Sequence, residues 1–181
     1  MPYVSYSVPS LRSLHAYHSV YSARHDEACR RLLRFKDGCS TAFAQYRAEV
    51  ARVVPDGCAV AVVPSHSQGL TESAVRRLAR AVASEGGRTD ATPCLWRTRT
   101  ISKLSRGGDR RQEVHLESVV VRERHLIEGR RVVLLDDVTT SGGSFLACRD
   151  LLLNAGAQSV ECLALAKTHS SRTPARTLAH A

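Results

Sequence analysis

Several features that would set a chain apart from ordinary globular proteins are missing from this 181-residue sequence. No apolar run approaches the ~18 residues that a membrane-crossing helix needs, which argues against a membrane protein or a membrane partner. The first twenty residues lack the basic segment followed by an apolar one that marks a secretory signal, so we expect a cytoplasmic protein. With 43% hydrophobic and 24% charged residues, the composition is that of one globular domain with a buried core.

Closely spaced metal ligands are also scarce. The six cysteines include no C-x-x-C pair, and several stand within apolar stretches, so we interpret them as small buried hydrophobic residues in a reducing compartment. They are Cys29, Cys39, Cys58, Cys94, Cys148 and Cys162. The N-terminal segment contains His15, His18 and His25. These histidines could suggest a metal site, but we favour the interpretation that they belong to a polar segment without a metal.

Aromatic residues make up only 5% of the chain, and no basic stretch is interleaved with them. This weakens the case for a platform on which the bases of single-stranded nucleic acid stack. Positive charge, in contrast, is abundant, and the formal net charge is +9. Such a charge attracts polyanions, so nucleic acid and a small phosphate-rich substrate both stay open as partners.

Apolar patterns alternate between helical and extended along the chain. The expected helices cover residues 26–35, 40–54, 70–87 and 144–156, with Asp26 at the positive end of the first and Ser40 as the N-cap of the second. The expected strands cover residues 58–64, 93–97, 114–123, 131–135 and 159–166. This order predicts an α/β fold with a mainly parallel sheet, in which ligands bind at the carboxyl ends of the strands.

Residues 132–144 read VVLLDDVTTSGGS and combine a strand, two carboxylates and a glycine-rich loop. The apolar run places Asp136 and Asp137 at the end of a buried strand, where two adjacent carboxylates need hydrogen-bond donors or a cation. The loop leads into a helix near Ser144, and a helix start of this kind favours an anion. Because carboxylates suit sugar hydroxyls and the loop suits a phosphate, the pattern indicates a ribose 5-phosphate site.

This stretch resembles the phosphoribosyl pyrophosphate (PRPP) signature of the type I phosphoribosyltransferases, and the layout of the chain is most similar to the ComF-like branch. The resemblance implies a mainly parallel central sheet flanked by helices, with a small hood from the N-terminal segment and the C-terminal tail. The implied division is an arm and hood segment over residues 1–50, a core over residues 51–168 and a polar tail over residues 169–181. The cysteine zinc module and the PVPL loop of many ComF-like proteins are missing.

The resemblance assigns the donor site to two loops. Asp136 and Asp137 would hold the 2′ and 3′ hydroxyls of the ribose. The 5′-phosphate would be bound by Thr139, Thr140, Ser141, Gly142, Gly143 and Ser144. The candidates for binding the pyrophosphate are Ser65, His66 and Ser67, which follow an earlier predicted strand, with an ordinary strand-to-helix turn as the alternative.

The family also carries a flexible loop that closes over the site. Residues 97–111 contain six basic residues and two adjacent glycines, so we assign the lid to them. Its catalytic candidates, which stay unranked, are Arg99, Lys103, Arg106, Arg110 and Arg111. Their charges would neutralise the pyrophosphate as it leaves. The alternatives are a solvated basic loop and a nucleic-acid contact.

The implied reaction transfers the 5-phosphoribosyl group of PRPP to a nitrogen acceptor with release of pyrophosphate. Mg²⁺ would bridge the ribose hydroxyls and the pyrophosphate, held through PRPP and water near Asp136 and Asp137 without a direct protein ligand. Thr140 stands where enzymes for 6-oxopurines have an aspartate, and it is no strong proton acceptor, which argues against hypoxanthine or guanine. Lys167 is a candidate for contacting the base or, equally, a surface cap of the last strand.

The acceptor itself is not encoded in a readable motif. Aromatic residues of the N-terminal segment, Tyr17 and Phe35 among them, are candidates for stacking on a base or for packing within the hood. The alternative to an enzyme is a non-catalytic ComF-like protein that senses PRPP or associates with nucleic acid in regulation or DNA processing. The resemblance also leaves room for a homodimer.

Overall fold

The computed structural model describes residues 11–19, 22–69, 72–101 and 116–168. Its centre is a five-stranded sheet in the order β1–β7–β6–β2–β3, and every neighbouring pair in it is parallel. The expected α/β fold with a mainly parallel sheet is therefore confirmed. The strands of this sheet are β1 (Leu11–Tyr17), β2 (Ala59–Val62), β3 (Thr89–Asp90), β6 (Arg131–Thr139) and β7 (Ser159–Thr168).

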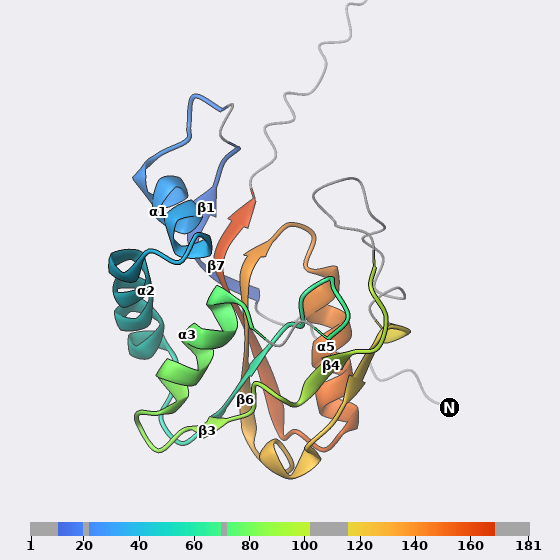
Figure 1. Cartoon of the computed structure of the whole chain (residues 1–181). Coiled ribbons are helices and arrows are strands. Elements are labelled where there is room, and N and C mark those ends of the chain that lie inside the picture. The colour runs from blue at the N-terminus through green and yellow to red at the C-terminus, as the bar shows by residue number, and fades with distance from the viewer. Residues whose placement is uncertain (1–10, 20–21, 70–71, 102–115, 169–181) are drawn as a thin grey trace, which may run out of the picture.

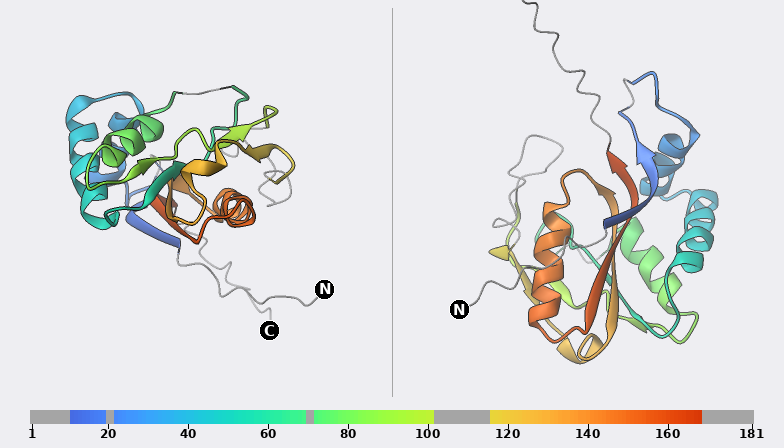
Figure 2. Two further views of the ribbon diagram at one scale, coloured as in Figure 1. Left: turned by 90° about the horizontal axis from the view of Figure 1, so that it is seen from below. Right: turned by 180° about the vertical axis from the view of Figure 1, so that it is seen from behind.

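Helices cover both faces of the sheet (Figures 1 and 2). One face carries α1 (Glu27–Lys36), α2 (Ser40–Val53) and α3 (Ala74–Ala83). The other face carries α5 (Gly143–Asn154), together with an antiparallel pair formed by β4 (Leu95–Arg97) and β5 (Val119–Val121). A 3₁₀ turn, η2 (Arg124–Leu126), precedes β6.

Alternation along the strands supplies apolar side chains to both layers. In β6, Val133 and Leu135 pack with α1–α3, while Val132 and Leu134 pack on the α5 side. Both faces of the strand are buried, which explains why the sequence runs apolar without interruption. Each such side chain stabilises the fold by roughly 1.5–3 kcal/mol through its removal from water.

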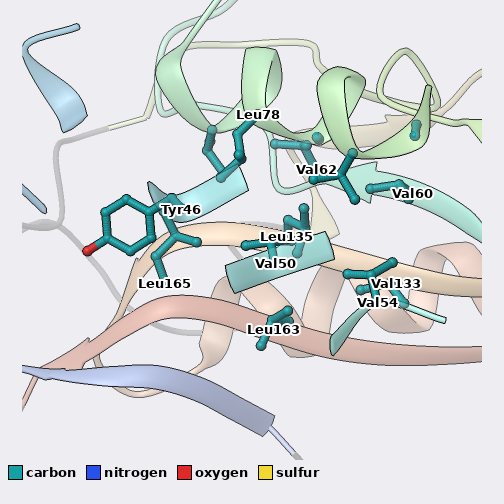
Figure 3. Close-up of a cluster of buried hydrophobic side chains, with 14 of the residues drawn as sticks. Tyr46, Val50, Val54, Val60, Val62, Leu78, Val133, Leu135, Leu163 and Leu165 are labelled. Atoms are coloured by element: carbon teal, nitrogen blue, oxygen red, sulfur yellow. The ribbon is translucent and has the colours of Figure 1, made fainter. Parts of the chain in front are cut away.

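Figure 3 shows the cluster between the sheet and the α1–α3 layer. Tyr46 and Val50 of α2 and Leu78 of α3 lie over strand residues such as Leu135 and Leu165. All five side chains are fully buried. The cluster fixes α1 next to the sheet and so determines which residues of α1 reach the carboxyl ends of the strands.

The helix starts show one cap that the sequence analysis did not name and correct two expectations. Asp26 caps α1, and its Oδ1 accepts from the Cys29 N–H at 3.0 Å. The prediction of Ser40 as an N-cap is wrong, because α2 begins at Ser40 and the cap position falls on Cys39, which makes no side-chain cap bond. The third helix begins at Ala74 instead of residue 70, since the Ser73 side chain accepts from the Arg76 N–H and caps it there.

The N-terminal segment contributes to the central sheet. β1 pairs with β7 from Leu11↔Cys162 to Tyr17↔Thr168, although it lies in the segment that the sequence assigned to the arm and hood.

All six cysteines are free, and five of them are buried. Among the helices of the described ranges, none combines the length and apolarity that a membrane span requires. The predicted tail, residues 169–181, lies outside the described residues.

Candidate ligand-binding site

The Asp136–Asp137 pair lies inside β6, whereas the sequence pattern ended the strand at Leu135. β6 continues to pair with the longer β7 as far as Thr139↔Lys167. On its other side, pairing with β2 ends at Leu135↔Val62. The two aspartates therefore stand just beyond the carboxyl end of β2, at an edge where β6 has a neighbour on one side only.

A pocket of about 590 Å³ opens at this edge of the sheet. One wall is the stretch 136–144, which includes every residue predicted to hold the ribose and its phosphate. A second wall is formed by Pro64, Ser65 and His66, which follow β2. Ser67 belongs to the same loop but does not line the pocket. The structure thus brings together the two predicted donor-binding loops, which we call the β6 loop (139–144) and the β2 loop (64–68).

The two carboxylates have different surroundings. The Asp137 carboxylate forms an ion pair with Lys36 at the end of α1, with 3.1 Å between Nζ and Oδ2. The Asp136 Oδ1 accepts from the backbone N–H of Asp137 at 2.8 Å. Burial raises the pKa of Asp136 well above its ordinary value, and the adjacent Asp137 raises it further, against the smaller effects of the hydrogen bond and of Lys36. Asp136 is therefore a carboxylate that hydroxyl donors or a cation would stabilise.

The β6 loop turns directly into α5. Gly142 adopts a left-handed conformation with φ +83° at the N-cap of this helix, a conformation that glycine adopts without strain. A Cβ at this position would lie 3.2 Å from Leu11 Cδ2 of β1. The first N–H groups of an α-helix have no carbonyl partner within it, so the start of this 12-residue helix presents donors and partial positive charge at the pocket wall.

Thr139 connects the β6 loop to the end of β7. Its side chain is buried, and its carbonyl oxygen accepts from the Thr168 Oγ1 at 3.1 Å. Thr168 lines the pocket, whereas Lys167, the predicted base contact, is exposed and does not. The alternation of side chains along β7 explains why these neighbours differ.

Two cations of the pocket lining, Lys36 and Arg97, were not named as site residues from the sequence, which counted Arg97 in the lid over residues 97–111. The structure instead buries Arg97 at the end of β4, and the predicted strand over residues 93–97 held the signal, because Arg97 and Leu95 lie on the same face of it and both are buried. No local pattern marks Lys36, since its position follows from the packing of α1 against the sheet. Tyr17, a sequence candidate for base stacking, lines the pocket, whereas Phe35 is buried in the core.

The lid candidates lie mostly beyond the described ranges. Arg99 is exposed, pairs with Glu117 at 2.8 Å and does not line the pocket. The candidates outside the described residues are Lys103, Arg106, Arg110 and Arg111.

The three N-terminal histidines are spread over different contacts. His15 Nε2 lies 2.7 Å from a Glu49 carboxylate oxygen, and His25 Nδ1 lies 3.0 Å from the His18 carbonyl oxygen. Within the ranges that the structure describes, no group of three or more His, Cys, Asp or Glu side chains could hold a metal ion.

Three enzymes are among the solved structures to which this chain shows some similarity. The allosteric regulatory enzyme of purine biosynthesis is 22% identical, with a TM-score of 0.44 over 75% of this chain and 26% of its own. Hypoxanthine phosphoribosyl transferase of Trypanosoma cruzi is 14% identical, with a TM-score of 0.38 over 77% and 66%. Purine phosphoribosyltransferase from Pyrococcus horikoshii is 13% identical, with a TM-score of 0.38 over 85% and 87%.

The chain thus spans about a quarter of the first of these structures and just under two-thirds of the second. No curated protein matches the sequence significantly. The sequence does match the phosphoribosyl transferase domain over residues 48–180, which is well over half of the chain and includes both the β2 loop and the β6 loop. The chain therefore belongs to the phosphoribosyl transferase domain family.

Proposed function

We propose that this protein binds PRPP with Mg²⁺ and transfers the 5-phosphoribosyl group to a nitrogen acceptor. The observation that carries the proposal is one pocket of about 590 Å³ lined by both the β6 loop and the β2 loop. Membership of the phosphoribosyl transferase domain family supports phosphoribosyl transfer in general. The lining of the pocket supplies a candidate wall for the ribose phosphate, residues 136–144, and one for the pyrophosphate, residues 64–66.

The ribose and its phosphate occupy the wall of residues 136–144 in this proposal. The carboxylates of Asp136 and Asp137 accept hydrogen bonds from the two ribose hydroxyls, and such bonds to charged acceptors are worth roughly 1.5–3 kcal/mol each. The 5′-phosphate lies at the start of α5, where backbone N–H groups and the hydroxyls of Thr140 and Ser144 surround it. Gly142 keeps this turn free of a side chain.

The residues present fit Mg²⁺ as a companion of the donor. Oxygen ligands suit this ion, and Asp136 and Asp137 supply carboxylate oxygens at the pocket. Asp137 is already paired with Lys36, so the ion would take most of its ligands from PRPP and water. When bound, the ion supplies neutralising charge to the pyrophosphate group.

In the transfer step, the bond from C1 of the ribose to the pyrophosphate oxygen breaks and a bond from C1 to the acceptor nitrogen forms. The protein's own contribution is positioning and electrostatics. Asp136 and Asp137 hold the ribose and place negative charge near the ring, where positive charge develops. The leaving pyrophosphate binds in this proposal at the β2 loop, where Ser65 and His66 line the pocket.

The acceptor occupies the remaining apolar part of the pocket. Tyr17, Leu32, Leu33 and Val75 line it, and three of these four residues come from the N-terminal segment. An apolar wall with one aromatic ring suits a planar base that enters beside the ribose. We place the enzyme in the cytoplasm, where free thiols such as its six cysteines persist.

The test is release of pyrophosphate from PRPP and Mg²⁺ in the presence of a panel of nitrogen bases. Turnover on one base, absent when Mg²⁺ or the base is left out, is the expected result. The second candidate is a PRPP-sensing protein that associates with nucleic acid, which the net charge of +9 favours. No turnover on any base, together with nucleic-acid binding that persists at moderate salt, would favour this candidate over the enzyme.

A further inference from the structure

We infer that Arg97 is a positioning residue that holds the β2 loop in the conformation that binds pyrophosphate, an inference that rests on the proposed function. Arg97 is the last residue of β4, and its side chain is only 3% exposed. It also lines the pocket. A buried arginine at this place needs an explanation, because burial of a guanidinium is unfavourable without well-placed acceptors.

The guanidinium of Arg97 binds the β2 loop through its main chain. Its Nε donates to the Ser65 carbonyl oxygen, and its Nη2 donates to the Pro64 carbonyl oxygen at 3.3 Å. Its Nη1 donates to the Ser118 Oγ at 2.6 Å, which anchors the group from the opposite side. Three nitrogens of one rigid plane are thereby engaged, a geometry that the single ammonium group of lysine does not reproduce.

These bonds fix the direction of two successive peptide groups. The described residues contain no cis peptide bond, and in a trans peptide the C=O and the following N–H point in opposite directions. With the carbonyls of Pro64 and Ser65 directed at Arg97, the N–H groups of Ser65 and His66 point away from it. Successive N–H groups held in this way form a concave site for an anion, and both residues line the pocket.

The far end of the β2 loop is held by the segment that follows β4. The Ile101 N–H donates to the His66 carbonyl oxygen at 2.9 Å. The Gln68 N–H donates to the Thr100 Oγ1 at 3.0 Å. The loop is therefore shaped by residues about thirty positions later in the chain, with Arg97 making the largest number of these contacts.

The three acceptors described above are neutral oxygens, and burial lowers the pKa of Arg97. Substitutions of Arg97 can distinguish two roles, positioning of the β2 loop and direct charge on the pyrophosphate. If Arg97 positions the loop, the planar guanidinium is required. If it acts as a charge on the pyrophosphate, any cation of similar length suffices.

The experiment compares Arg97→Lys and Arg97→Met with the wild type by calorimetric titration. The probes are inorganic pyrophosphate with Mg²⁺, ribose 5-phosphate, and PRPP with Mg²⁺. We expect both variants to lose about tenfold or more in affinity for pyrophosphate and PRPP, because the β2 loop loses its fixed donors, and to keep the affinity for ribose 5-phosphate. Arg97→Lys should bind no better than Arg97→Met, and a full rescue by lysine overturns the positioning role.

Arg76→Lys is the matched control. Arg76 is also buried, at 6% exposure, and its Nη1 donates to the Thr92 carbonyl oxygen, but it does not line the pocket. We expect this variant to keep both affinities. If the Arg97 variants fail to fold, Ser118→Ala removes one anchor of the guanidinium and should weaken pyrophosphate binding several-fold, and unchanged binding in that variant contradicts the inference.

The proposed function and the role of Arg97 are contradicted by different results. A wild-type protein that binds neither PRPP nor ribose 5-phosphate contradicts the proposed function, and the inference about Arg97 is refuted with it. A wild-type protein that binds both, alongside Arg97 variants with undiminished pyrophosphate affinity, contradicts only the inference.

Discussion

The β6 loop and the β2 loop line the same pocket but obtain their shapes differently. The β6 loop is shaped by its own residues: Gly142 makes the left-handed turn, and the start of α5 follows directly. Within the β2 loop the Ser67 N–H donates to the Ser65 Oγ, but the carbonyls of Pro64, Ser65 and His66 and the N–H of Gln68 are held by Arg97 and by residues 100–101. The turn of the β6 loop is thus set by its own glycine, whereas the β2 loop depends mainly on tertiary contacts.

This difference predicts separable defects. Changes within residues 136–144 should affect binding of the ribose phosphate, whereas distant changes around β4 should affect binding of the pyrophosphate. Inorganic pyrophosphate and ribose 5-phosphate report on the two loops independently. Substitutions in and around each loop therefore test whether the two parts of the site are separate.

The largest effect is expected from Asp136→Asn combined with Asp137→Asn. Loss of two charged acceptors for the ribose hydroxyls should lower the affinity for PRPP and for ribose 5-phosphate by roughly a thousandfold. Calorimetry measures both. Asp150→Asn is the control, since Asp150 is a half-buried aspartate of α5 that does not line the pocket. Undiminished donor affinity in the double variant, with a folded circular dichroism spectrum, would place the ribose elsewhere.

A smaller effect is expected from Gly142→Ala. The added Cβ must adopt the left-handed conformation and lies 3.2 Å from Leu11 Cδ2, so the start of α5 should shift and the affinity for ribose 5-phosphate should fall by about tenfold. Gly57→Ala is a matched control, since Gly57 has φ +69° and open space around it. Both variants should lose about 1–2 kcal/mol of stability in thermal unfolding. Equal ligand binding by both would remove Gly142 from the phosphate site.

Asp136→Asn alone should stabilise the free protein at neutral pH by about 1 kcal/mol. The reason is that burial of the charged Asp136 carboxylate in the absence of ligand lowers the free energy of unfolding, and the neutral amide of asparagine avoids this loss. Since burial raises the pKa of Asp136, the folded state keeps its proton to a higher pH than the unfolded chain. Stability due to this group is present below the unfolded pKa, near 3.9, and is lost as pH rises through the folded pKa.

The advantage of Asp136→Asn over the wild type should therefore grow as pH rises through this window and stay constant above it. Urea unfolding of both proteins from pH 4 upward measures the difference. A constant difference across the whole range would mean that the Asp136 carboxyl has no raised pKa in the folded protein.

The smallest effect is expected from Thr100→Val. Removing the Oγ1 that accepts from the Gln68 N–H loosens one end of the β2 loop and should weaken pyrophosphate binding two- to fourfold, about 0.5–1 kcal/mol. Ribose 5-phosphate binding should not change. Thr89→Val on β3, outside the pocket, is the control. A defect in ribose 5-phosphate binding in Thr100→Val would show that the two loops are not independent.

Much of the fold was predictable because its signals are local. The apolar runs of β2, β6 and β7, the acidic start of α1 at Asp26 and the glycine turn at Gly142 depend on neighbouring residues only. The expectations that were wrong concern boundaries. Ser40 begins α2 without capping it, and β6 runs past Leu135 because β7 offers it further partners.

The α/β fold, the family and the β6 loop could be inferred from the amino-acid sequence alone, since a strand, two aspartates and a glycine turn are contiguous in the chain. The cations that join them are set by long-range packing. The Lys36–Asp137 ion pair forms because α1 packs against the sheet that carries Asp137. The contacts of Arg97 with Pro64 and Ser65 form because β4 lies next to the β2 loop in space, though 32 positions separate Arg97 from Ser65. Such contacts have no local signature, because packing over the whole core decides them.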